Sequence, residues 1–560
     1  MDVSSVSMEL SGSTTSNHTL NSTGGGSWEI SDKAKLCRFL CYGSEGALYS
    51  TRENGHIRME KTGALQSMLQ EKQGAEVLEE IKRFAQDGQA VRLEPSIFAL
   101  ALCSQNPDVN TKQAAFKALK DVCREPAHLF SFIKYKKELK EHMKCGIWGR
   151  ALRRALSDWY NEQDAMSLAA AVTKCKQREG WSHQDLLRLS HTKPARDAIA
   201  LISKYVTKGW KEVQVAHEDK ENAEEVMRVL SYLEVVEKVK HSRDETEVVT
   251  LIEEHKLERE QLLTEHLKFK QVWSALLKEM PLHSVVKMLG RLTSGKVLEP
   301  GSSETQFLCD RIQSETALKQ AKIHPFSILL ATENYKKGHG YLGKPKWEAD
   351  RNILKAMDSA FYKSFMNVEP VGKCFVVAVD MSGPPSSIVP GTSISTAAAA
   401  AAIAMIFART EADTHVLVYS EEAMVPFSIS ADMTLKEATD ELVKSTRERG
   451  AQPSGSAFKL QFQSESRDCT VPIQWATENR KAVDVFVTLS NNPLWTLTAS
   501  PVESLKKHRE TSGANSKLVM CNLTNIGIAI PDTEDRGLLT ISGFDLGAFS
   551  VIRNLAQDLI

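Results

Sequence analysis

The chain has 560 residues and a formal net charge of −1, with 25% charged and 42% hydrophobic residues. This composition is typical of an ordinary globular protein of roughly two to four domains. Because the whole chain is nearly neutral, a charged binding surface could arise only from a local segment. The ten cysteines include no C-x-x-C pair. Dispersed thiols in a reducing compartment are therefore favoured over a zinc site.

Residues 1–27 are mostly Ser, Thr, Asn and Gly, without the basic and apolar regions of a signal peptide. This segment is predicted to be a disordered tail. No run of eighteen apolar residues follows, so we expect no membrane span. We expect a cytoplasmic protein, with access to the nucleus left open.

Residues 28–369 carry apolar side chains at helical spacing, for example in residues 76–88, 96–105, 111–123 and 185–191. Several of these segments end in Gly or Pro, as helices often do. Alternating strand patterns are scarce. The region is predicted to form paired antiparallel helices of the solenoid type, although it has no strict sequence period.

The pattern changes in residues 370–560. Short apolar runs rich in β-branched residues occupy residues 374–379, 414–419, 483–488 and 517–521, and helical stretches such as the alanine-rich residues 396–408 separate them. Apolar strands that alternate with helices indicate a parallel sheet covered on both faces. A separate doubly wound α/β domain is predicted here.

Residues 131–210 are locally basic. They contain sixteen Lys or Arg and eight Asp or Glu, a balance of +8, together with residues that can stack or donate, including Trp148, Trp181 and His183. Cations bind phosphates with release of counterions, and aromatic rings stack on unpaired bases. This pattern is compatible both with an RNA-binding surface and with an ordinary solvated helical face.

Long segments of the chain resemble the TROVE-module family of Ro (SS-A) autoantigens. The resemblance includes LKEHMKCGIWGRALRRALSDWYN at residues 139–161, KQREGWSHQDLLRLSH at residues 176–191 and GFDLGAFSVIRNLAQDLI at residues 543–560. It implies HEAT-like helical repeats closed into a ring, followed by a von Willebrand factor A-type domain that locks the ring.

The resemblance also implies two kinds of RNA ligand for a monomeric ring without DNA specificity. Small non-coding Y RNAs would bind the outer surface, and single-stranded ends of misfolded non-coding RNAs would enter the central hole. Carried over by position, the Y RNA surface includes Lys174, Arg178 and His191, and His191 is expected to be exposed at a helix end. The predicted footprint further includes His183, Lys137, Lys140, Lys144, Arg150, Arg153 and Arg154.

A metal-binding A-type domain carries D-x-S-x-S at the end of its first strand, where oxygen ligands bind Mg²⁺ or Mn²⁺. Here the motif is Asp380-Met-Ser382-Gly-Pro384, and Pro384 has no side-chain oxygen. The later threonine position is taken by Arg467, after an insertion-like stretch at residues 447–466, and the next strand ends at Ser490 or Asn491. We expect a degenerate site that binds a divalent metal weakly or not at all unless Asp468 restores coordination. No cofactor is expected to be required.

The sequence contains no G-x-S-x-G elbow and no H-E-x-x-H motif, so no enzymatic activity is expected. The leading hypothesis is an RNA-binding protein that acts in small-RNA stability or RNA quality control. The alternative is a helical-solenoid scaffold whose A-type domain binds protein ligands. A paralogue that keeps the fold but has changed its RNA specificity also stays open.

Overall fold

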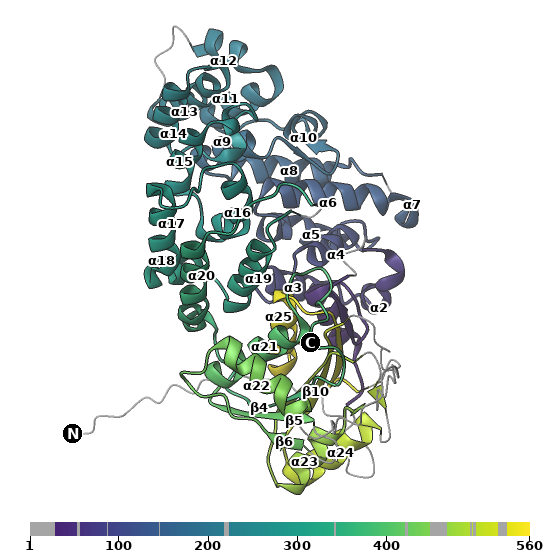
Figure 1. Ribbon diagram of the computed structural model, residues 1–560. Coiled ribbons are helices and arrows are strands. Elements are labelled where there is room, and N and C mark those ends of the chain that lie inside the picture. The colour runs from purple at the N-terminus through teal and green to yellow at the C-terminus, as the bar shows by residue number, and fades with distance from the viewer. Residues whose placement is uncertain are drawn as a thin grey trace, which may run out of the picture.

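The computed structural model describes residues 28–52, 57–86, 88–144, 146–217, 223–340, 343–419, 424–447, 467–492, 495–496, 500–524 and 535–560. The predicted tail and nearly all of the predicted insertion at residues 447–466 lie outside these ranges. The described helices α1 to α20 form an arc, and the C-terminal domain lies between the two ends of the arc (Figure 1).

The first half of the arc is built from short helices in two layers. Helix α3 packs against α5, and α4 packs against α6, so each helix faces the next but one along the chain. These helices are α1 (Asp32–Tyr42), α2 (Gly63–Gln70), α3 (Gly74–Gln86), α4 (Glu94–Cys103), α5 (Val109–Val122), α6 (Pro126–Glu138), α7 (Lys140–Met143), α8 (Arg150–Asn161), α9 (Ala165–Lys174) and α10 (His183–Ser190).

In the second half, consecutive helices also pack together, α13 against α14 and α14 against α15, and α20 packs on both α17 and α19. Its helices are α11 (Asp197–Lys208), α12 (Trp210–His217), α13 (Glu224–His241), α14 (Glu245–His255), α15 (Lys270–Glu279), α16 (Leu282–Ser294), α17 (Ser303–Gln313), α18 (Glu315–Ala321), α19 (Pro325–Lys336) and α20 (Arg351–Lys363). Short 3-10 turns occur at η1 (Met59–Lys61), η2 (Arg259–Gln261), η3 (His266–Lys268) and η4 (Ser364–Asn367).

Local sequence explains where many of these helices begin. Ser31, Asp108 and Asp164 each precede a helix and accept a hydrogen bond from the backbone N–H three residues later. Such caps satisfy N–H groups that have no partner within the helix. In α8, Leu152 and Leu156 face the core one helical turn apart, as an amphipathic helix requires. None of the described helices is both long and apolar enough to cross a membrane.

The C-terminal domain contains a seven-stranded sheet of order β1-β11-β10-β8-β4-β5-β6, in which every pairing is parallel except that of β5 with β6. The prediction of a helical repeat ring followed by a doubly wound parallel sheet is confirmed. Its strands are β1 (Leu48–Ser50), β4 (Cys374–Asp380), β5 (Asp413–Tyr419), β6 (Met424–Pro426), β8 (Val485–Ser490), β10 (Lys517–Asn522) and β11 (Leu538–Ser542). A separate small pair joins β7 (Arg467–Asp468) to β9 (Trp495–Thr496).

Helices cover both faces of the sheet. Alternate residues of β4 point to opposite sides: Val377 and Val379 join a core continuous with the helical arc, whereas Val376 and Ala378 join a second, smaller core. The first face is covered by α21 (Thr396–Thr410), α22 (Leu435–Arg447) and α25 (Leu546–Ala556), and the second by α23 (Val471–Glu478) and α24 (Pro501–Ser512).

Strand β1 belongs in sequence to the predicted helical module but lies at the edge of the sheet, where it pairs in parallel with β11. The buried guanidinium of Arg38 in α1 donates to the carbonyl oxygens of Arg536 at 2.9 Å and Leu538 at 3.4 Å. The beginning of the arc is therefore hydrogen-bonded into the C-terminal domain, and the sequence did not predict this connection.

The other end of the arc packs on the same domain through aromatic rings. Phe326 of α19 lies edge-on to Phe544 at 5.5 Å and to Phe549 at 5.4 Å between ring centroids. Because both ends contact the C-terminal domain, the domain closes the arc into a ring.

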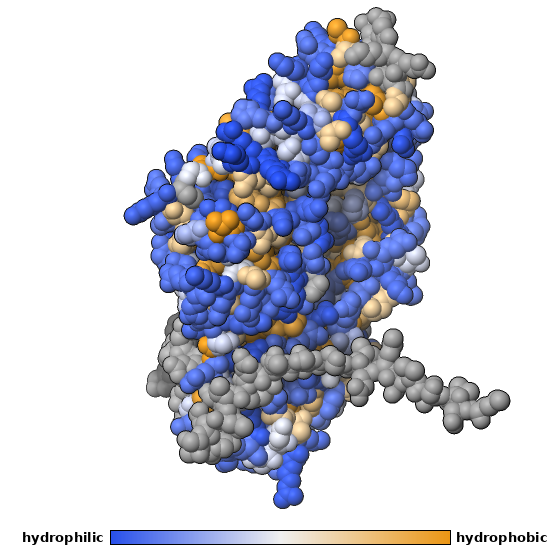
Figure 2. All heavy atoms as spheres, turned by 180° about the vertical axis from the view of Figure 1, so that it is seen from behind, coloured by the Kyte–Doolittle hydropathy of each residue, from blue (hydrophilic) through white to orange (hydrophobic). Residues whose placement is uncertain are grey.

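A cavity of about 740 Å³ lies where the two ends of the arc approach the domain. It is lined from the beginning of the arc by Arg92, from α16 by Lys287 and Arg291, and from the C-terminal domain by Asp545. The face in Figure 2 is mostly hydrophilic and is hollowed between the two arms of the arc.

Candidate nucleic-acid interface

A two-residue hairpin interrupts the helices in the basic segment. Strands β2 (Gln177–Arg178) and β3 (Trp181–Ser182) flank Glu179 and Gly180, whose φ angles are 55° and 77°. Two consecutive positive φ angles are typical of a type I′ turn. Lys134 of α6 pairs with Glu179 at 2.9 Å and so holds the hairpin against that helix. Gly180 readily accepts a positive φ and marks a turn in the sequence, whereas Glu179 is not one of the residues that usually precede Gly in such hairpins.

The hairpin brings predicted cations and aromatic rings together. Arg178 lies directly opposite Trp181 across the strand pair, and the Lys137 ammonium is 5.9 Å from the Trp181 ring centroid. The ring of Trp148 meets Trp181 edge-on at 5.9 Å. Both tryptophans are half-buried, whereas Lys137 and Arg178 are exposed. This cluster of Lys137, Trp148, Arg178 and Trp181 offers cations for phosphates beside rings on which bases can stack.

More of the predicted cations follow along α7 and the start of α8. Helix α7 lies at the outer edge of the arc (Figure 1). Lys140, Lys144, Arg150 and Arg154 are exposed, and Arg153 is half-buried. No side chain caps the N-terminus of α8. Its first N–H groups therefore add to the positive potential of the surface.

Lys174, Arg178 and His191 come from three different elements. Lys174 ends α9 and is paired with Glu258 at 2.6 Å, so an anion must compete with that carboxylate. Arg178 lies in the hairpin. His191 follows the last residue of α10 with a φ of 53° and is exposed, as its place at a helix end predicted.

Asn161 positions the loop that follows His191, and sequence reasoning missed it. Its side-chain nitrogen donates to the carbonyl of Lys193 at 3.0 Å, and its side-chain oxygen accepts from the N–H of Ala195 at 2.8 Å. The end of α8 thus fixes the backbone between two predicted contact regions. A lone asparagine at the end of a helix gives no sequence signal for this role.

His183 was predicted to bind RNA, and that prediction is wrong because the side chain is only 2% exposed. Its Nδ1 hydrogen-bonds the hydroxyl group of Tyr160 at 2.8 Å, and its ring packs edge-on against Phe130. Burial lowers the pKa of His183 to about 4, so the ring is neutral at pH 7. It is a core residue of α10.

Lys136 contributed to the local charge count but is also buried, at 2% exposure. Its ammonium donates to the Oγ of Ser104 at 2.9 Å and lies within 6 Å of the rings of Phe116 and Phe132. The exposed surface is therefore less basic than the sequence count indicated.

The degenerate metal position lies at the carboxyl edge of the sheet. Asp380, the last residue of β4, is buried and accepts hydrogen bonds from the Oγ–H of Ser490 at 2.7 Å and the N–H of Ser382 at 3.0 Å. The Oγ of Ser382 accepts from the side-chain amide of Asn492 at 3.1 Å. Protein donors thus satisfy oxygens that would face a cation in a metal-binding A-type domain.

The neighbouring positions do not restore an oxygen set for Mg²⁺ or Mn²⁺. The side-chain oxygen of Asn491 accepts from the N–H of Gly383 at 2.9 Å. Asp468 directs Oδ1 to the N–H and hydroxyl groups of Thr470, both at 2.8 Å. The side chain of Arg467 lies outside the described residues. Since Pro384 supplies no oxygen, the residues present do not fit a divalent metal of this type.

The fold and the surface together define a ring-shaped helical-repeat protein closed by a von Willebrand factor A-type domain, with a partly basic outer rim. The TROVE domain family matches residues 19–344, and the Ro60 vWA domain matches residues 374–556. The chain therefore belongs to the TROVE-domain family, and the resemblance found in the sequence is confirmed.

Two relatives match nearly the whole chain. An RNA-binding protein RO60 from Caenorhabditis elegans is 28% identical, covering 96% of this chain and 90% of the relative. The RNA-binding protein RO60 of Deinococcus radiodurans is also 28% identical and covers 96% and 95% of the two chains. The crystal structure of the Deinococcus radiodurans RO (RSR) protein superposes with a TM-score of 0.81 at 27% identity, over 95% of this chain and 100% of that one.

Proposed function

We propose that this protein binds RNA without acting as an enzyme, and that the outer surface formed by α6, α7, α8 and the β2-β3 hairpin is a principal contact. The observation that carries the proposal is the cluster of Lys137 and Arg178 beside the rings of Trp148 and Trp181. Relatives named as RNA-binding proteins along nearly the full length support the same ligand class.

We further propose that the outer surface binds small non-coding Y RNAs. Such RNAs combine a helical backbone, which exposed lysines and arginines recognise, with unpaired bases that stack on aromatic rings. The RNA would then run along the arc and contact two groups of residues. One group is Lys174, Arg178 and His191, and the other is the rim of Lys140, Lys144, Arg150, Arg153 and Arg154.

The cavity supports a second contact, for the single-stranded end of a misfolded non-coding RNA. Arg92, Lys287 and Arg291 supply cations there, and the half-buried Trp347 supplies a ring. A groove that combines positive charge with aromatic surface is the usual arrangement for single-stranded nucleic acid. We propose that the protein acts as a monomeric ring, without DNA specificity, in RNA stability and quality control in the cytoplasm, with access to the nucleus left open.

Crosslinking in cells, followed by purification of the full-length protein and sequencing of the attached RNA, tests this function. The expected result is enrichment of small structured RNAs that is lost in a Lys137→Ala, Arg178→Ala double variant. Co-purification of proteins that survives nuclease treatment, with no enriched RNA, would support the scaffold alternative instead and contradict the proposal.

A further inference from the structure

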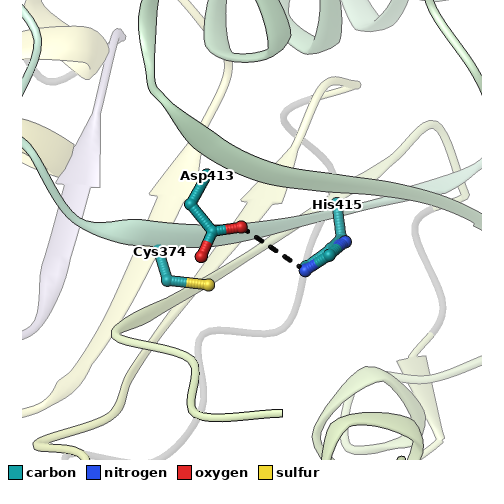
Figure 3. A group of neighbouring side chains, drawn as sticks. All are labelled: Cys374, Asp413 and His415. Atoms are coloured by element: carbon teal, nitrogen blue, oxygen red, sulfur yellow. Dashed lines mark ion pairs between the residues drawn. The ribbon is translucent and has the colours of Figure 1, made fainter.

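Three residues that can bind metals converge at the amino edge of the sheet, at the opposite end of β4 from Asp380. Cys374 begins β4, Asp413 begins β5, and His415 follows two residues later. Cys374 is paired in register with Asp413, and alternation along β5 puts His415 on the same face as Asp413. Figure 3 shows the three side chains turned toward a common space.

The spacing of the three ligand atoms suits a small cation. The Cys374 sulfur, an Asp413 carboxylate oxygen and a His415 ring nitrogen all lie within 4.8 Å of one another. Asp413 Oδ1 and His415 Nε2 are 3.5 Å apart. Two N or O ligands of tetrahedral zinc are about 3.4 Å apart, given bonds of about 2.0–2.2 Å. The sulfur lies within 4.8 Å of both other ligand atoms, and in a tetrahedral site with a Zn–S bond of about 2.3 Å it would lie about 3.6 Å from each, so a small adjustment completes the set.

The surroundings hold these ligands and leave a route for entry. The N–H of Cys374 donates to Asp484 at 2.9 Å, and the ring of His415 lies against Trp475 at 5.9 Å between centroids. The side chains of Asp413 and His415 are 63% and 30% exposed. A cation can therefore reach the group from solvent, while Asp484 holds the backbone of Cys374 and Trp475 orients the His415 ring.

We propose that Cys374, Asp413 and His415 bind a Zn²⁺ ion whose fourth position is open to water. A thiolate, an imidazole and a carboxylate form a donor set that suits zinc better than the hard cations Mg²⁺ and Ca²⁺. The site differs from that of metal-binding A-type domains in both its place and its donors.

Zinc binding must displace a proton. Burial and the neighbouring Asp413 carboxylate raise the pKa of Cys374 to about 12, so the thiol is protonated in the metal-free protein. On binding, the S–H bond breaks, the sulfur keeps the electron pair and bonds the cation, and the proton passes to solvent. The competing arrangement requires no metal: Asp413 faces His415 and accepts a hydrogen bond from the Cys374 thiol.

The test uses the full-length protein, stripped with a chelator and titrated with Co²⁺. A thiolate–Co²⁺ charge-transfer band in the near ultraviolet, saturating at one equivalent and abolished by Zn²⁺, is the expected result. Cys374→Ser should remove the band. His415→Ala and Asp413→Asn should weaken Zn²⁺ binding by more than the roughly 10–100-fold expected for a residue outside the ligand set.

Cys175→Ser is the matched control because Cys175 is another partly exposed cysteine, and it should keep the band and the affinity. Asp413→Asn changes an exposed side chain and should fold normally, which circular dichroism will verify. Absence of the band in the native protein would overturn the proposal. A band that persists in Cys374→Ser would also overturn it.

Discussion

Ser490 donates a hydrogen bond from its Oγ–H to Oδ2 of Asp380 at 2.7 Å, between residues paired in register on the adjacent strands β8 and β4. A hydroxyl group at this position satisfies a buried carboxylate without a cation. An acidic residue there would repel Asp380 unless a metal lay between them. The carboxyl edge of the sheet, and through it the closed ring, should therefore be stable in the absence of divalent metal.

Ser490→Asp should make stability depend on Mg²⁺. Two carboxylates about 4 Å apart repel by on the order of 4 kcal/mol at an effective dielectric constant of about 20. The melting temperature should fall in chelator and recover in millimolar Mg²⁺. Ser490→Asn is the control, because it adds bulk without charge and should not respond to Mg²⁺. A native protein whose melting temperature rises with Mg²⁺ would contradict the assignment of a degenerate site.

Lys137→Ala with Arg178→Ala should weaken RNA binding and flatten its dependence on salt. Each lost phosphate contact lowers the slope of log affinity against log salt by about 1. Lys174→Ala with Arg178→Ala should act in the same direction but less strongly, since Glu258 already pairs with Lys174. Gel shifts over a range of salt concentrations measure both slopes.

Two lysines elsewhere on the arc provide a control for the Lys137→Ala, Arg178→Ala variant. The half-buried Lys270 and the exposed Lys278 of α15 are paired with Glu299 and Glu253, and they do not belong to the predicted surface. Lys270→Ala with Lys278→Ala makes the same change in net charge and should leave the slope nearly unchanged. Equal slopes for the two double variants would remove the outer-surface assignment.

Acidification should destabilise the protein between pH 6.5 and pH 4. Burial lowers the pKa of both His183 and His324 to about 4, whereas an unfolded histidine titrates near pH 6.5. In this window the unfolded chain binds more protons, so the free energy of unfolding falls as the pH falls. The contribution of His183 alone is about 3 kcal/mol.

Urea unfolding at pH 7, 6 and 5 measures this effect. His183→Phe removes one of the buried histidines whose pKa is lowered and should flatten the pH dependence, although it also removes the hydrogen bond with Tyr160. Its RNA affinity at pH 7 should equal that of the native protein, since the ring is buried. A large loss of affinity in a folded His183→Phe variant would revive the prediction that His183 binds RNA.

Arg38→Met should loosen the connection between α1 and the C-terminal domain. It removes the donors to the carbonyl oxygens of Arg536 and Leu538, and hydrogen bonds from charged groups contribute about 1.5–3 kcal/mol each. Limited proteolysis should cut the variant near β11 faster than the native chain. Lys35→Met, on the same helix but half-buried, serves as the control. Equal cleavage rates would show that Arg38 does not hold this junction.

The sequence could predict those features that depend on residues close together in the chain. The apolar residues 374–379 and the alanine-rich residues 396–408 predicted β4 and α21 because burial on both faces of a strand or around a helix leaves a continuous apolar pattern. The basic segment could be found by charge alone. Charge alone could not show which residues of that segment are exposed and which are buried. Lys136 and His183 are buried because tertiary packing turns their side chains inward.

The remaining features depend on contacts between distant segments. Strand β1 has three residues, too few for a strand pattern, and its position is set by β11. Trp148 and Trp181 were recognised as rings that can stack, but their contact requires the hairpin to lie against α6. The group of Cys374, Asp413 and His415 depends on the register between two strands.

The pairing of β1 with β11 also affects folding during synthesis. Thr51, next to β1, hydrogen-bonds the carbonyl of Ser542, 491 residues further along the chain. At about 5–20 residues per second, a ribosome needs roughly 25–100 s to make the intervening chain. During that interval the edge that β1 will share is unpaired, and unpaired strand edges promote aggregation. The ring therefore cannot close until β11 has been synthesised, and chaperones that bind nascent chains have most reason to act on this protein before then.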